Sequence, residues 1–106
     1  MANTYKNAKL DLTTTSVTTL YTAASLTTGI FKSILVSEDS GNADTITITI
    51  TNGSDVFSLF KTKAIGANAT VELLDAPLVI ETSEVVKVTA ATANRLHVVA
   101  SILEIT

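Results

Sequence analysis

Threonine and isoleucine alternate without a break over residues 45–51, and a turn-forming Asn-Gly-Ser-Asp sequence follows at 52–55. Side chains of a strand point to opposite faces with a period of two, so Ile46, Ile48 and Ile50 share one apolar face. The intervening threonines share the other face, where a β-branched side chain fits the pleat and its hydroxyl can meet water. This pattern predicts a strand of an antiparallel sheet with one face in the core and the other face wet or in contact with another chain.

Comparable patterns recur at near-regular spacing along the chain. The Asn52-Gly53 pair favours positive φ and hence a tight hairpin turn. The segments 30–37 and 95–105 are apolar on both faces, which is typical of a strand that is central in its sheet or lies at an interface. The expected strands are 9–14, 17–22, 30–37, 44–51, 56–62, 69–74, 78–80, 85–90 and 95–105. About eight to nine short strands without an amphipathic helix indicate an all-β fold, either an antiparallel β-sandwich or a jelly-roll-like barrel.

The N-terminal residues stand apart from this pattern, because 1–8 are polar and precede the first apolar alternation. We expect them to form an arm outside a single β-sandwich domain that covers 9–106. The arm has no apolar segment of the kind found in a signal peptide, and no apolar run approaches the roughly 20 residues of a spanning helix. The sequence therefore predicts neither export by a signal peptide nor insertion into a membrane.

Hydrophobic residues make up 46% of the 106-residue chain and charged residues only 16%. A small chain with this many apolar residues should bury surface against copies of itself. Because closed cyclic symmetry achieves this without open-ended growth, we expect a homotrimer. Composition leaves open the alternative that threonine simply replaces charge on the solvent face. The net charge is −3 and the seven basic residues are scattered, which argues against a nucleic-acid partner. The absence of cysteine excludes disulfides and thiolate metal sites.

Candidate chemistry is sparse in this sequence. His97 is the only histidine and lies mid-strand among valine and leucine, so we interpret it as a partly buried structural residue rather than a catalytic one. A threefold assembly would be able to bring three copies of His97 to its axis. The carboxylates lie in pairs at turns, without the dense oxygen spacing of a calcium loop. The four glycines form no phosphate-binding pattern and the five aromatic residues form no stacking platform, so we expect no catalytic residue, metal or cofactor.

The order of five segments is informative beyond composition. They are TTLYT at 18–22, FKSILVS at 31–37, LLDAPLVIE at 73–81, VKVTA at 86–90 and the closing strand 96–105. This order resembles that of small β-sandwich virion proteins of tailed bacteriophages, in particular capsid decoration or cement proteins. The resemblance implies a non-enzymatic structural protein, often trimeric, that is made in the host bacterial cytoplasm. Its partner would be the major capsid protein on the outer face of the assembled head.

Tyr5, Lys6 and Lys9 are our candidates for docking on the capsid, because a polar arm is free to lie on a neighbour. Two alternative functions remain open. A tail, neck or fibre component of the virion would share the composition and the sandwich, and a carbohydrate-binding module would share the fold. A long fibre would show repeats or heptads, which this chain lacks, so the capsid surface is favoured.

The alternating strand generates a mutational prediction. Ile48→Asp should prevent folding, because an unpaired buried charge costs several kcal/mol against a total stability of roughly 5–15 kcal/mol. Thr47→Asp, on the opposite face, should be mild where that face is wet. Circular dichroism and thermal melting of the two variants measure the difference. Equal unfolding of both would show that the threonine face is also covered.

Overall fold

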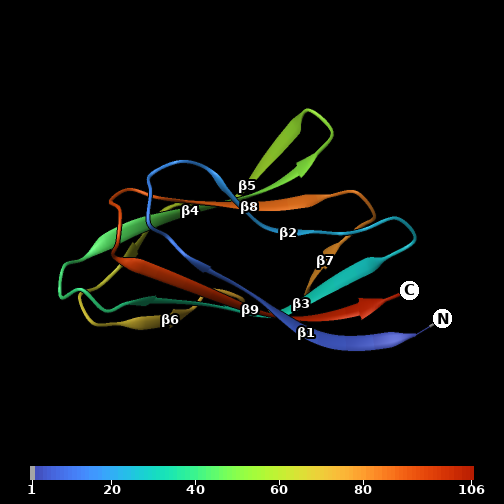
Figure 1. Cartoon of the computed structure of the whole chain (residues 1–106), viewed down its shortest axis with the longest axis horizontal. Coiled ribbons are helices and arrows are strands. Elements are labelled where there is room, and N and C mark those ends of the chain that lie inside the picture. Colours follow the sequence, from blue (N-terminus) through green and yellow to red (C-terminus); the bar gives the residue numbers. More distant parts are fainter. Residues whose placement is uncertain (1) are drawn as a thin grey trace.

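The computed structural model describes residues 2–106, which form two antiparallel sheets packed face to face (Figure 1). Sheet A has the order β1-β9-β3-β6, with β7 also paired to β3, and sheet B has the order β2-β8-β4-β5. The strands are β1 (Asn3–Asp11), β2 (Thr18–Thr22), β3 (Thr28–Glu38), β4 (Asp44–Asn52), β5 (Asp55–Ile65), β6 (Thr70–Glu72), β7 (Leu78–Ile80), β8 (Val85–Ala90) and β9 (Leu96–Ile105). This architecture confirms the predicted all-β fold and is consistent with the β-sandwich of the two predicted alternatives.

The core lies between the inward faces of the two sheets, as the period of two requires. In sheet B, Ile46 and Ile48 of β4 are fully buried. Across from them, sheet A contributes Phe31 and Ile34 of β3 and Val98 of β9, which are also fully buried. Each such side chain stabilises the fold by about 1.5–3 kcal/mol relative to an exposed position. The predicted isoleucine face of β4 is therefore confirmed as part of the core.

The threonine face of β4 is only half-buried, and one hydroxyl on it has a structural partner. Thr47 Oγ1 accepts a hydrogen bond from the backbone N–H of Thr62 at 3.0 Å. Thr62 has a φ of 48°, within an irregular stretch where β5 carries extra residues relative to β4. The hydroxyl satisfies an N–H that the irregular ladder leaves without a backbone acceptor.

Residues 3–8 belong to the sandwich and differ from the arm expected over 1–8, of which Met1 lies outside the described residues. Strand β1 pairs with β9 over its full length, from Asn3 opposite Ile105 to Asp11 opposite His97. Its inward-facing Ala8 and Leu10 pack against the core. The reason is that β9 would otherwise expose a row of unpaired backbone groups, and a polar segment can satisfy these groups without supplying apolar side chains.

Strand β3 changes partner along its outer edge, and a carboxylate closes the gap. It pairs with β7 at one end and with β6 at the other, so the backbone around Ile34 lies between two partners. The Glu72 carboxylate accepts hydrogen bonds from the Ile34 N–H at 2.8 Å and from the Ser33 hydroxyl. Burial alone would raise the pKa of Glu72, but these hydrogen bonds and those from the Leu74 and Leu73 N–H groups outweigh burial and lower it.

A second carboxylate joins two loops at the end of β3. Glu38 is 2% exposed and accepts hydrogen bonds from the N–H groups of Ser40 (2.7 Å), Gly41 (3.1 Å) and Asn68 (3.0 Å). The Ser40 hydroxyl also donates to it. Burial raises the pKa of Glu38, yet these donors stabilise the charged form more strongly, so the pKa is lowered from 4.5 to about 2.

Shortening the chain so that Met is followed by Ala8 should destabilise the sandwich. The truncation removes the backbone hydrogen bonds of the first half of β1, which predicts a loss of about 2–4 kcal/mol and a fall in Tm on the order of 10 °C. Differential scanning calorimetry measures both. The control is Thr4→Ser, which keeps the backbone at an exposed position on the other side of β1 from Tyr5 and should change Tm far less. An unchanged Tm in the truncated chain would instead support a free arm.

The hydrogen bonds to Glu38 should make stability depend on acid pH. Because the folded pKa of about 2 lies below the ordinary 4.5, the stabilising contribution is complete above about pH 4.5 and is lost as the pH falls toward 2. Denaturant unfolding of Glu38→Gln across this window should therefore show a shallower pH dependence than the original chain. Glu81→Gln, at an exposed turn, is the matched control and should keep the original slope.

Candidate binding surfaces

The outward face of sheet A carries an apolar row that crosses four strands. Residues opposite each other in antiparallel strands point to the same side, and the register aligns Tyr5 with Leu103, Leu103 with Ile30, and Ile30 with Val79. Their sequence neighbours Ile102 and Phe31 are buried in the core, so this row faces away from sheet B. Tyr5 is 77% exposed and Val79 is 52% exposed. Exposed contiguous apolar surface of this kind makes the row a candidate interaction site.

Further rows lie beside the apolar row on the outer face of sheet A. The exposed Lys32, an extra residue of β3 at the register shift between Phe31 and Ser33, also lies on this face. One row aligns Lys9, Val99, Leu35 and Glu72, with Val99 and Leu35 each about two-fifths exposed. Between this row and the apolar row lie small polar residues, namely Asn7, Ser101 and Ser33. The central strands of this face, β3 and β9, are the strands whose sequence is apolar on both sides. This two-sided apolar pattern is the sequence signal that identifies the outer face of sheet A as a candidate surface.

The structure separates the three sequence-predicted docking residues. Tyr5 and Lys9 lie on the outer face of sheet A, whereas Lys6 lies on the other side of β1. The Lys6 Nζ is 3.7 Å from Glu104 Oε1, and the Tyr21 hydroxyl donates to Glu104 Oε2 at 2.6 Å. Burial, followed by the hydrogen bond to and the charge of Glu104, raises the pKa of Tyr21. Lys6 therefore belongs to a network that links β1, β9 and β2 at the edge of the sandwich.

Tyr21 also explains a glycine in the opposite sheet. A Cβ atom at Gly29 would lie 2.7 Å from the Tyr21 hydroxyl and 2.8 Å from its ring. The ring also makes an edge contact with Phe31, with 5.4 Å between centroids. Gly29 thus lets the Tyr21 ring cross from sheet B and reach Glu104 in sheet A.

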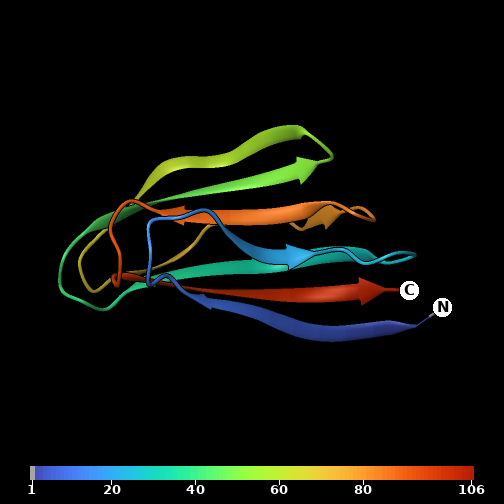
Figure 2. The same cartoon turned by 45° about the horizontal axis from the view of Figure 1, so that its top comes forward.

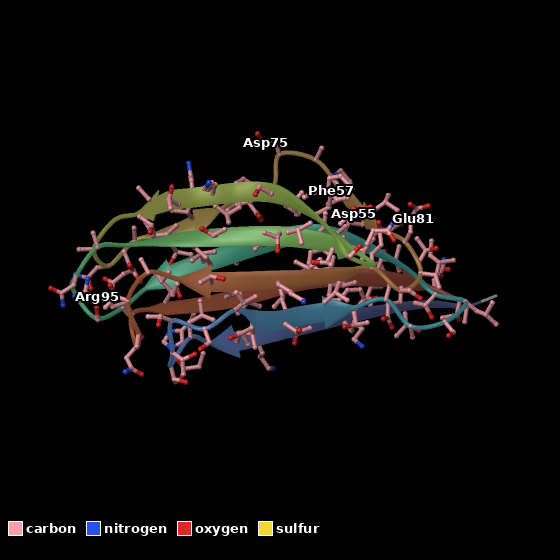
Figure 3. All side chains as sticks on the ribbon, turned by 90° about the horizontal axis from the view of Figure 1, so that it is seen from above. Asp55, Phe57, Asp75, Glu81 and Arg95 are labelled. Carbon is pink, nitrogen blue, oxygen red and sulfur yellow. The ribbon has the colours of Figure 1, made fainter. Side chains whose placement is uncertain are left out.

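A second exposed apolar surface lies at the end of the β4–β5 hairpin, which we call the hairpin tip (residues 50–58). Val56 and Phe57 are 62% and 55% exposed. Figures 1 and 2 show this end of the hairpin standing away from the rest of the sandwich. In Figure 3, Asp55 and Phe57 lie toward one end of the molecule and Arg95 lies toward the other. The hairpin tip is therefore a projecting feature, distinct from the broad outer face of sheet A.

His97 lies on the outer face of sheet A with a carboxylate at each ring nitrogen. Its Nε2 is 3.2 Å from Asp11 Oδ1, and its Nδ1 is 3.5 Å from Asp39 Oδ2. The two carboxylates lie at different nitrogens, so they do not converge with the ring on one point. Within residues 2–106, no group of three or more histidine and carboxylate side chains is arranged to hold a metal ion.

The concave features are open depressions. One of about 260 Å³ lies over β1 and β9 beside Lys9 and His97, and one of about 350 Å³ lies at the base of the β4–β5 hairpin. In the second, Asp44 accepts from the Thr92 N–H and Arg95 donates to the Ala43 carbonyl. No helix within residues 2–106 is long and apolar enough to cross a bilayer. No protein-family model matches the chain, and no curated protein matches its sequence.

Proposed function

We propose that this chain is a non-enzymatic structural protein of a tailed-bacteriophage virion, which binds the capsid surface and stabilises it. The observation that carries the proposal is the presence of two separate exposed apolar surfaces on one small sandwich: the outer face of sheet A and the hairpin tip. A subunit of an assembly needs one surface for neighbouring copies and another for the particle. The resemblance of the segment order to that of capsid decoration proteins supports the choice of particle.

The hairpin tip is the surface that contacts the major capsid protein in this proposal. It projects from the sandwich and presents Val56 and Phe57 on opposite faces of one strand, because they lie opposite Thr51 and Ile50 of β4. A narrow apolar projection is suited to insertion into a crevice of a partner, where a single aromatic anchor can contribute a large share of the binding energy. The broad face of sheet A, which holds Tyr5 and Lys9, is the competing docking surface.

Phe57→Ser should weaken binding to undecorated phage heads by about tenfold or more, because it removes the apolar anchor. It should leave the fold intact, since more than half of the side chain is exposed. Co-sedimentation of the purified protein with heads measures the affinity, and thermal melting verifies the fold. Val17→Ser is the matched control, because Val17 is equally exposed but lies in the β1–β2 connection, away from both surfaces.

Other outcomes of this experiment would redirect the proposal. Loss of binding in Tyr5→Ser or Lys9→Ala, with Phe57→Ser unaffected, would move the capsid contact to sheet A. Binding of the intact protein to purified tails instead of heads would identify a tail or neck component. Binding to neither particle would overturn the proposed function.

A further inference from the structure

We propose that two copies of this chain stack back to back through the outer faces of sheet A, around a two-fold axis parallel to the strands and above the line between β9 and β3. The inference rests on a self-complementarity of that face, row by row. It is independent of whether the particle bound by the hairpin tip is a phage head.

The topology determines which residues such an axis brings together. The face is four strands wide, with β1 at one edge, β9 and β3 in the middle, and β6 and β7 sharing the other edge. A two-fold rotation about an axis along the strands places β9 over β3 of the second copy and β1 over its β6 and β7. The rotation does not change the position of a row along the strand direction. Each row therefore faces the same row of the second copy, with the order of its residues reversed.

The apolar row is complementary to itself under this rotation. Tyr5 meets Val79 of the second copy, and Leu103 meets Ile30 of the second copy. All four are aromatic or aliphatic, and the row crosses the face from edge to edge. Stacking therefore removes a continuous apolar stripe from water on both copies, which is the main favourable contribution to association.

The charged row is complementary in sign. Lys9 stands at one edge and Glu72 at the other, with Val99 and Leu35 between them. Reversal brings Lys9 to Glu72 of the second copy and Val99 to Leu35 of the second copy, and symmetry makes each contact twice. The hydrogen bonds that lower the pKa of Glu72 keep its carboxylate ionised for this pairing.

The remaining part of the face is polar and contains one unfavourable contact. The small polar row brings Ser101 to Ser33 of the second copy. The row at the far end brings His97 to Ser37 of the second copy and leaves Asp11 opposite the polar Thr70. Lys32, exposed at the register shift of β3 between Phe31 and Ser33, would lie near Lys32 of the second copy beside the axis, and this like-charge contact opposes association. The usual tilt of about 30° between packed sheets displaces the outermost contacts.

The area of the face agrees with this assignment. Three strands of about nine residues, with β6 and β7 of three residues each at the fourth position, give a face of roughly 500 Å² in projection at about 4.8 Å between strands and 3.3 Å per residue. Pleating and side chains raise the accessible area toward the roughly 800 Å² per partner of a standard interface. A contact of a face with itself requires a two-fold axis, so this surface favours a dimer over the homotrimer expected from composition.

Charge exchange at one predicted contact tests the proposal. Tyr5→Lys and Val79→Glu each place a single charge in the apolar row, and each should weaken self-association by about tenfold or more. The double variant restores attraction, because Lys at 5 would meet Glu at 79 of the second copy. Within one chain these positions lie on strands at opposite edges of sheet A, so a rescue must come from the other copy.

Sedimentation equilibrium and light scattering across the micromolar range supply the readout. The original chain should show twice its 11.1 kDa mass, each single variant should shift toward the monomer, and the double variant should recover most of the dimer. Val17→Glu, exposed outside the face, should remain dimeric, and thermal melting of every variant verifies folding. A monomer at all concentrations, a mass of three chains, or a double variant no better than the singles would overturn the proposal.

Discussion

The pairing of β9 on both sides is the constraint on which the rest of the structure depends. β1 and β3 hydrogen-bond to opposite edges of this strand along nearly its whole length, from Leu96 to Ile105. The register that buries Val98 and Ile102 also places Val99 and Leu103 on the outer face. A slip of one residue would exchange the two sets, so the core and the candidate interface are specified together.

Two carboxylates support β3 where its strand pairing is interrupted or ends. At the gap between β6 and β7, the Glu72 carboxylate replaces a missing backbone acceptor for Ile34. At the end of β3, Glu38 holds the loops of Ser40 and Asn68 with its two oxygens. These two carboxylates are ionised supports of the backbone, and this role accounts for acidic residues that would otherwise suggest a binding site.

A small sandwich whose central strands are apolar on both faces has a surplus of apolar surface. One side of β3 and β9 covers the core, and the other side remains exposed in the single chain. An assembly subunit resolves this surplus by burying the second side against a neighbour, in the same way that a sheet buries its first side against its partner sheet. In our proposal, the outer face of sheet A makes the contact between two copies of the chain, and the hairpin tip makes the contact with the particle.

The sequence by itself determined the local features of this protein. The alternation over 45–51, the Asn52-Gly53 turn and the spacing of nine apolar segments were sufficient for an all-β sandwich, because side-chain period and turn chemistry are local properties. Only the tertiary structure decided the role of residues 3–8. This polar segment forms a strand because the edge of β9 presents backbone N–H and C=O groups that it can pair with. Likewise, Tyr5, Leu103, Ile30 and Val79 are far apart in sequence and become one row only through strand order and register, which non-local pairing sets.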